Sequence, residues 1–128
     1  MRAWQARLRQ QGAAADPMEV VRAHVAAVRC RDADLMAADY TDAARIRRGA
    51  QVVVPRTYFP QALQRLGDTR LVVHALDRIA DAADGSVRIA MQWELRGDRA
   101  DGTRGTDTFT LQGDRIIDQV VDLHTADY

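Results

Sequence analysis

The stretch Gly105–Leu123, GTDTFTLQGDRIIDQVVDL, decides the fold. Its first half alternates, and side chains in a strand point to opposite faces with a period of two. Three threonines therefore share the wetter face, whereas Asp107, Phe109 and Leu111 share the other. A Gln-Gly-Asp turn follows, and Arg115–Leu123 is rich in isoleucine and valine, which predicts a returning antiparallel strand.

Asp107 is the most informative residue of this pair of strands. A carboxylate in an apolar row is costly to bury unless it is paired or protonated. One interpretation is a carboxyl group that faces a pocket. The other is a structural aspartate that accepts hydrogen bonds from loop amides or pairs with a nearby arginine. The strand alone leaves both open.

The composition limits the class of protein. The chain has 128 residues, 47% of them hydrophobic, which predicts one folded domain with a single core. The formal net charge is zero, so nothing favours nucleic acid or an anionic membrane surface as a partner. Cys30 is the single cysteine, and no apolar run reaches the length of a membrane span or signal peptide. We therefore expect a soluble, cytoplasmic protein.

The first helix supplies a second candidate residue. Residues 1–15 are interpreted as an N-terminal extension, either a frayed arm or a short helix, and residues 16–128 as the domain. Asp16 and Pro17 form a helix start, and the helix is predicted to run to about Arg31. His24 lies on its apolar stripe. It is either a satisfied core histidine or a polar group that faces a cavity under the helix.

The remaining segments complete an α+β pattern. Leu71–Ala80 carries apolar residues on both faces, which predicts a sheet covered on both sides, and Val87–Leu95 alternates cleanly. Two prolines, Pro55 and Pro60, are expected to limit how far a helix that ends at Gly67 extends backward. The other predicted elements are a helix over Asp32–Asp39 that ends through Tyr40–Ala44, strands over Arg45–Arg47 and Gln51–Val54, and a helix over Gln61–Leu66. Helices followed by a long antiparallel meander predict helices packed on one face of a curved sheet.

Four short stretches resemble a known superfamily. They are the first helix with Arg31–Leu35, the segment Asp39–Ala43, the segment Trp93–Gly97, and Gly105–Phe109 with Gly113–Ile116. With these, residues 16 to about 123 resemble the nuclear-transport-factor-2-like superfamily, in its SnoaL-like and ketosteroid-isomerase-like group. The resemblance implies a cystatin-like α+β roll: a cone-shaped, curved antiparallel sheet wrapped around the N-terminal helices. It also implies an apolar pocket and a homodimer.

The resemblance also implies roles for individual residues. Asp107 falls on the carboxylic acid that donates a hydrogen bond to the substrate oxyanion of the isomerases, and His24 falls on a tyrosine that shares this task. The isomerase base would lie near Arg48, where no acid stands. The final-strand aspartate of the epoxide hydrolases falls at Val121, and a histidine of many SnoaL-like sequences falls at Gln119.

The sequence contains no motif for metal binding, nucleophilic catalysis or phosphate binding. The three histidines lack the spacing of a metal site, and no nucleophile elbow or phosphate-binding loop is present. We expect no metal and no cofactor.

The sequence thus predicts a small-molecule pocket protein, an acid–base isomerase, cyclase or hydrolase that acts on an apolar substrate. Asp107 and His24 would be catalytic, and His24 would change protonation near neutral pH. The remaining residues expected around the substrate are Tyr40, Tyr58, Phe59, Met91, Trp93, Phe109, Gln119 and Val121. The alternative is a non-catalytic ligand-binding or dimerisation module. A homodimer is expected on the outer face of the sheet, where Ile116 and Val120 would otherwise be wet.

Overall fold

The computed structural model describes residues 16–128, and the predicted N-terminal extension lies outside the described residues. Three helices, six strands and a short 3-10 turn make up this part of the chain. In chain order they are α2 Pro17–Arg29, α3 Ala33–Ala38, β1 Tyr40–Arg48, β2 Gln51–Val53, α4 Pro55–Leu66, β3 Arg70–Asp81, β4 Val87–Arg96, η2 Asp98–Ala100, β5 Arg104–Gln112 and β6 Arg115–Leu123.

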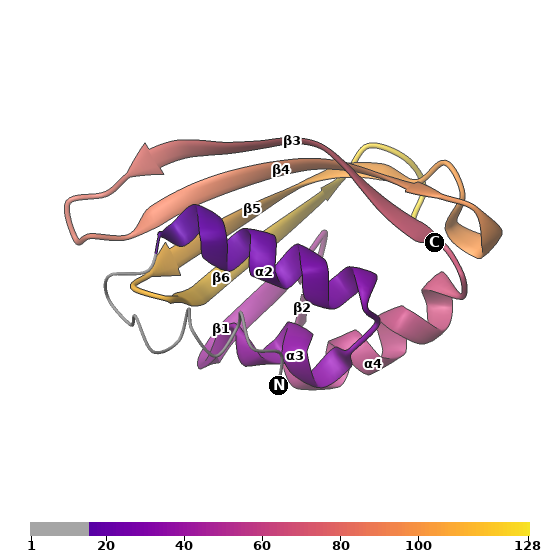
Figure 1. Ribbon diagram of the computed structural model, residues 1–128, viewed down its shortest axis with the longest axis horizontal. Helices are drawn as coiled ribbons and strands as arrows, with labels where there is room; N and C mark the ends of the chain where they lie inside the picture. The colour runs from indigo at the N-terminus through magenta and orange to yellow at the C-terminus, as the bar shows by residue number, and fades with distance from the viewer. Residues whose placement is uncertain (1–15) are drawn as a thin grey trace.

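The strands form one sheet in the order β2-β1-β6-β5-β4-β3. Every neighbouring pair is antiparallel except β1 and β6, which run parallel. Figure 1 shows the sheet curving over the helices, with α2 lying along its inner face. The α+β roll predicted from the sequence is confirmed, and the parallel pair is the departure from an all-antiparallel sheet.

Helix α2 begins as its sequence predicts. The Asp16 side chain accepts a hydrogen bond from the backbone N–H of Met18 at 2.9 Å, and Pro17 takes the first turn. His24 is 3% exposed, on the stripe that packs against the sheet. The helix ends at Arg29, two residues before the predicted end, because Arg31 adopts a φ of 57° in the left-handed region.

Two predicted boundaries in the middle of the chain are wrong. Tyr40–Ala44 belongs to strand β1 and not to a helix end. The pairing of β1 with β6 is irregular between Tyr40 and Arg45, so the period of two that identifies a strand is interrupted there. Helix α4 passes through Pro60. Pro60 and Arg56 are both exposed, so water can bond the carbonyl group that the proline leaves without a helical N–H.

Strand β3 is not covered on both faces, contrary to the prediction. It lies at the edge of the sheet, none of its residues is buried, and its last five residues, 77–81, are exposed. Ile79 has 54% of its surface exposed. The helices of residues 16–128 lie on one face of the sheet, and apolar residues on the other face of β3, such as Ile79, reach solvent.

The predicted position of Ile116 on the outer face is also wrong, because Ile116 is fully buried. Leu111 pairs with Ile116 and Thr110 pairs with Asp118, so the intervening Ile117 is an extra residue on β6. Such a bulge changes the face on which the following side chains lie. Val120 stays on the outer face, 41% exposed.

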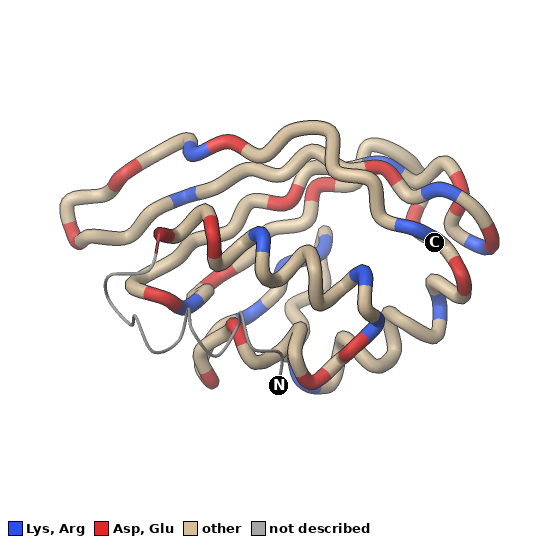
Figure 2. Tube along the Cα trace, in the orientation of Figure 1, with Lys and Arg blue, Asp and Glu red and all other residues tan. Residues whose placement is uncertain are grey.

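The charged residues of the described chain do not separate by sign. Figure 2 shows basic and acidic residues interspersed along helices, strands and loops. Within residues 16–128, no helix has the length and apolar character that crossing a bilayer requires.

Gly105 on β5 is required by a close approach to its neighbour on β4. It pairs with Trp93, and a Cβ atom added at Gly105 would lie 2.6 Å from Cζ2 of the indole. It would also lie 2.7 Å from the backbone oxygen of Asp122. Any side chain at this position therefore moves the indole or the backbone of β6.

We expect Gly105→Ala to lower the free energy of unfolding by about 1–3 kcal/mol, the usual cost of overpacking. Urea unfolding followed by circular dichroism measures this change. Thr108→Ala, on the outer face of the same strand, is the control and is expected to cost less. Equal midpoints for Gly105→Ala and the unmodified protein would contradict the close approach.

Candidate functional site

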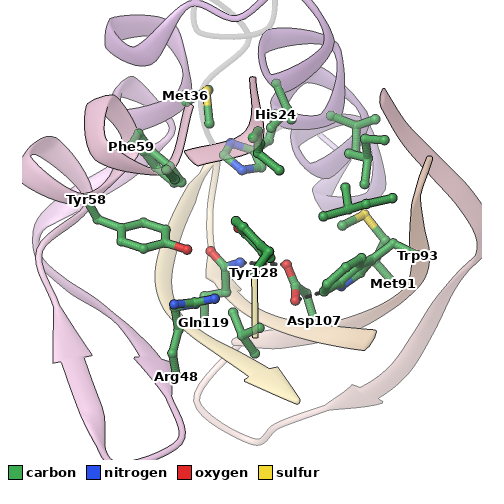
Figure 3. Close-up of a pocket in the computed structure, with 17 residues that line it drawn as sticks. His24, Met36, Arg48, Tyr58, Phe59, Met91, Trp93, Asp107, Gln119 and Tyr128 are labelled. Carbon is green, nitrogen blue, oxygen red and sulfur yellow. Dashed lines mark hydrogen bonds between the residues drawn. The ribbon is translucent and has the colours of Figure 1, made fainter. Parts of the chain in front are cut away.

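A cavity of about 90 Å³ lies between the helices and the inner face of the sheet (Figure 3). Its walls come from the three helices, from five strands and from the segment after β6. They are His24, Val25, Val28, Met36, Arg48, Tyr58, Phe59, Ala62, Leu66, Leu71, Met91, Trp93, Leu95, Asp107, Gln119, Val121 and Tyr128. Common ligand pockets measure roughly 300–1,000 Å³, so this cavity is small.

The structure brings together most residues that the sequence predicts around a substrate. Of those ten, all line the cavity except Tyr40 and Phe109. Phe109 is fully buried behind the wall, where its ring centroid lies 5.8 Å from that of His24. Tyr40 is 4% exposed and reaches the wall through its hydroxyl group.

Asp107 is held by two neighbouring strands. Nε1 of Trp93 on β4 donates to Oδ1 at 2.9 Å, and Nε2 of Gln119 on β6 donates to Oδ2 at 2.8 Å (Figure 3). The carboxyl group therefore has one side-chain donor on each oxygen. Among residues 16–128 it is bonded neither to loop amides nor to an arginine, so the structural interpretation of Asp107 does not describe its contacts.

The hydrogen bonds continue from Asp107 toward α2. The hydroxyl group of Tyr40 donates to Oε1 of Gln119, and it lies 3.4 Å from Nε2 of His24. His24, Tyr40, Gln119, Asp107 and Trp93 thus form one buried polar chain across the cavity wall. The pKa of the Tyr40 hydroxyl is raised well above its usual value by burial, so it stays protonated and remains a donor.

Burial sets the titration of both candidate catalytic groups. Burial raises the pKa of Asp107 to about 6, although the donors Trp93 and Gln119 and the charge of Arg48 oppose this shift. Burial lowers the pKa of His24 to about 4, opposed by the backbone of Met36. The expectation that His24 titrates near neutral pH is therefore wrong. Asp107 is the group whose pKa lies near neutrality, and His24 is a neutral imidazole.

Sequence reasoning missed Arg48 as a residue of the cavity. Its side chain is 4% exposed, and Nη2 donates to Oδ1 of Asp127 at 2.7 Å. Its guanidinium carbon lies 5.4 Å from the ring centroid of Tyr58 and 5.5 Å from that of Tyr128. Ile46, two residues earlier on β1, is fully buried, so the alternation of the strand was the signal that places Arg48 inside.

Tyr128 belongs to the segment that follows β6, and it was also missed because no periodicity marks an irregular segment. Within residues 16–128, no three histidine, cysteine or acidic side chains are grouped as a metal ion would require.

No family model and no curated protein matches the sequence. Solved structures match over most of the chain. A SnoaL-like protein from Burkholderia thailandensis is 14% identical, covers 85% of this chain and 95% of its own, and has a TM-score of 0.68. An NTF2-like protein from Cytophaga hutchinsonii is 8% identical over 84% of this chain and 89% of its own, with a TM-score of 0.68.

The chain has the NTF2-like fold. A third structure with this fold is the epoxide hydrolase/cyclase-like enzyme SalBIII, which takes part in pyran ring formation in the polyether salinomycin. It is 22% identical over 84% of this chain and 89% of its own, with a TM-score of 0.63. The TM-scores establish the NTF2-like fold, whereas identities this low carry no activity over to this chain.

The pKa of Asp107 predicts that the ionised carboxylate opposes folding. The pKa rises from 3.8 to about 6 in the folded protein. No penalty exists below the unfolded value, the penalty grows between the two values, and it is constant above the folded one. At about 1.4 kcal/mol for each pH unit, the penalty is roughly 3 kcal/mol at pH 8 and about half of that at pH 5.

We therefore expect Asp107→Asn to stabilise the protein, by roughly 3 kcal/mol at pH 8 and less at pH 5. The new amide can donate to Gln119 if the Gln119 amide turns over, while Tyr40 then accepts from Gln119 and donates to Nε2 of His24, so the chain of hydrogen bonds between these four residues is kept. Thermal melts at both pH values test this. Asp122→Asn, which changes an exposed carboxylate on β6, is the control. A variant that melts below the unmodified protein at pH 8 would contradict the raised pKa.

Proposed function

We propose that the protein is an enzyme that moves a proton on an apolar small molecule, in an isomerisation, a cyclisation or a hydrolysis. One observation carries this proposal: a carboxyl group with a pKa of about 6, at Asp107, faces an apolar cavity. An acid–base catalyst works best when its pKa lies near the pH at which it operates. At neutral pH Asp107 is mainly ionised and acts as the proton acceptor.

The contacts of Asp107 support this role. Trp93 and Gln119 each occupy one lone pair, which fixes the plane of the carboxylate and leaves each oxygen able to accept a further proton. The Tyr40 hydroxyl group donates to the amide oxygen of Gln119, and the neutral His24 in turn contacts that hydroxyl group. These residues position the base. Once protonated, Asp107 is the acid that returns the proton to another atom of the substrate.

Two neighbours in fold have names that suggest chemistry of this kind. One is the epoxide hydrolase/cyclase-like SalBIII, and the other is a putative aromatic ring hydroxylase from Novosphingobium aromaticivorans. The second is 15% identical over 84% of this chain and 86% of its own, with a TM-score of 0.67. Neither name transfers an activity, but both support an apolar small molecule as the occupant of such a cavity.

The alternative is a ligand-binding module without catalysis. Two observations favour it. The cavity is small, and among residues 16–128 no second acid lines it beside Asp107. A reaction that needs one carboxylate as base and another as acid would then lack its second group.

Ring opening of 1,2-benzisoxazole separates the two functions. A base removes the C3 proton, the nitrogen–oxygen bond breaks, and 2-cyanophenolate forms without any other reactant. We expect the unmodified protein to accelerate this reaction, with a rate that rises with pH to a plateau and an apparent pKa near 6. Absorbance of the phenolate measures it.

Asp107→Asn is expected to abolish this acceleration while keeping the fold. Asp122→Asn, on the exposed side of β6, is the matched control and is expected to keep it. Binding of benzisoxazole by the unmodified protein with no acceleration would favour the binding module. Acceleration that survives Asp107→Asn would reject Asp107 as the base.

We also propose a cytoplasmic homodimer. The sole cysteine, Cys30, is exposed and unbridged, which fits a reducing compartment. On the outer face of the sheet Val120 is 41% exposed, beside the threonines of β5 and Arg47 of β1. Burial of Val120 and of the methyl groups of the neighbouring threonines against a second copy would remove them from water.

Val120→Arg is expected to shift the protein from dimer to monomer, because two arginines would face each other in a buried interface. Sedimentation at micromolar concentration measures the mass. Ile79→Arg, an exposed residue near the far end of β3, is the control. A monomer in the unmodified protein would reject the dimer.

A further inference from the structure

Arg48 carries an unused donor inside the cavity wall. Its Nε atom is buried and has no hydrogen-bond partner among the described residues. A guanidinium group has five N–H donors and favours a carboxylate that takes two of them side by side. Asp127 takes only Nη2. The ion pair with Asp127 therefore leaves the Nε donor of Arg48 without a hydrogen bond, and Arg48 lines the cavity.

Asp127 is a replaceable counter-ion. Its side chain is 51% exposed, and it belongs to the segment after β6, which forms neither helix nor strand. The neighbouring Tyr128 places its ring beside Arg48 and lines the cavity (Figure 3). Displacement of Asp127 would draw Tyr128 away with it. One movement would thus free the guanidinium group and enlarge the cavity.

We propose that Arg48 anchors the carboxylate of a small ring-bearing acid, an aromatic or alicyclic carboxylate, and that Asp127 holds the same position when the ligand is absent. The proposal rests on the proposed function and refines it: the molecule in the cavity would be an apolar ring that carries one carboxylate. Exchange of one carboxylate for another keeps the buried cation paired throughout, so the exchange avoids the cost of an uncompensated buried charge.

The dimensions of the cavity agree with this exchange. A cavity of about 150 Å³ is known to take benzene. The 90 Å³ present here is smaller, so a ring fits only when Tyr128 gives way. The rings of Tyr58 and Phe59 and the indole of Trp93 then offer flat apolar walls. The ring of the acid would lie between its anchor at Arg48 and the base at Asp107.

An adjacent cleft adds positive charge. This cleft, of about 340 Å³, shares the wall residues Val28, Leu66, Leu71 and Leu95 with the cavity. Three arginines, Arg29, Arg31 and Arg70, line it together with a single acid, Asp68. Figure 1 shows the end of α4, the start of β3 and the C-terminus at one end of the molecule. The local excess of arginine over acid in the lining of this cleft favours the approach of an anion.

Benzoate and benzamide test the anchor, because they have the same size and shape and differ in charge. Isothermal titration calorimetry on the unmodified protein is expected to show benzoate bound at least about tenfold more tightly than benzamide. Asp127→Asn removes the internal competitor. It is expected to tighten benzoate further, by several-fold, and to tighten benzamide less, because only benzoate gains the freed guanidinium group while both gain from an easier movement of Tyr128.

Arg48→Gln is expected to abolish the preference for benzoate. Arg47→Gln is the control, because it changes the preceding arginine on β1, which is half-exposed and paired with Asp118 on the outer face. This variant is expected to keep the preference for benzoate. Asp127→Asn carries the test if Arg48→Gln does not fold. Equal affinities for benzoate and benzamide in both the unmodified protein and Asp127→Asn would overturn the anchor, as would no binding of either.

The outcome is distinguishable from that of the benzisoxazole reaction. A preference for benzoate without ring opening would keep the anchor and reject the catalytic function. Ring opening without any preference for benzoate would keep the base at Asp107 and reject the anchor at Arg48.

Discussion

The two hydrogen bonds to Asp107 are the constraint on which the rest of the site depends. A carboxyl group inside an apolar wall is tolerated only when its oxygens have donors, and the donors here come from the strands on either side, β4 and β6. A shift of either strand by one residue would turn Trp93 or Gln119 to the outer face. The register of three strands, the position of Tyr40 and the absence of a side chain at Gly105 all serve this one arrangement.

Two charged groups line the cavity, and the fold treats them differently. Asp107 is deep, has only neutral donors and titrates near neutral pH. Arg48 keeps its charge and meets a carboxylate that is half in solvent. The first arrangement suits a group that gains and loses a proton, and the second suits a group that exchanges partners. The apolar cavity lies between the proposed base, Asp107, and the proposed anchor, Arg48, so one bound molecule could contact both.

Simple alternation was enough to predict much of the site. The period of two in β5 placed Asp107 inward, and the stripe of α2 placed His24 under the helix. Alternation failed where the chain departs from it. The irregular stretch of β1 hid the first five residues of the strand, and the strand predicted over Arg45–Arg47 stopped one residue before Arg48. The extra residue Ile117 moved Ile116 into the core. The inward position of Tyr128 depends on the path of an irregular segment, which no local pattern encodes.

The parallel pairing of β1 with β6 has a consequence for how the protein folds. The strands β3 to β6 pair with their neighbours in sequence, whereas the contacts from Tyr40 to Gln119 and from Arg48 to Asp127 each join residues 79 apart. Closing so long a loop is the slow part of forming a sheet. Until β1 docks, β6 is an open edge, with its backbone groups free to pair with another chain. The cavity is complete only after that step, so a ligand that binds there stabilises the sheet in which β1 is paired with β6.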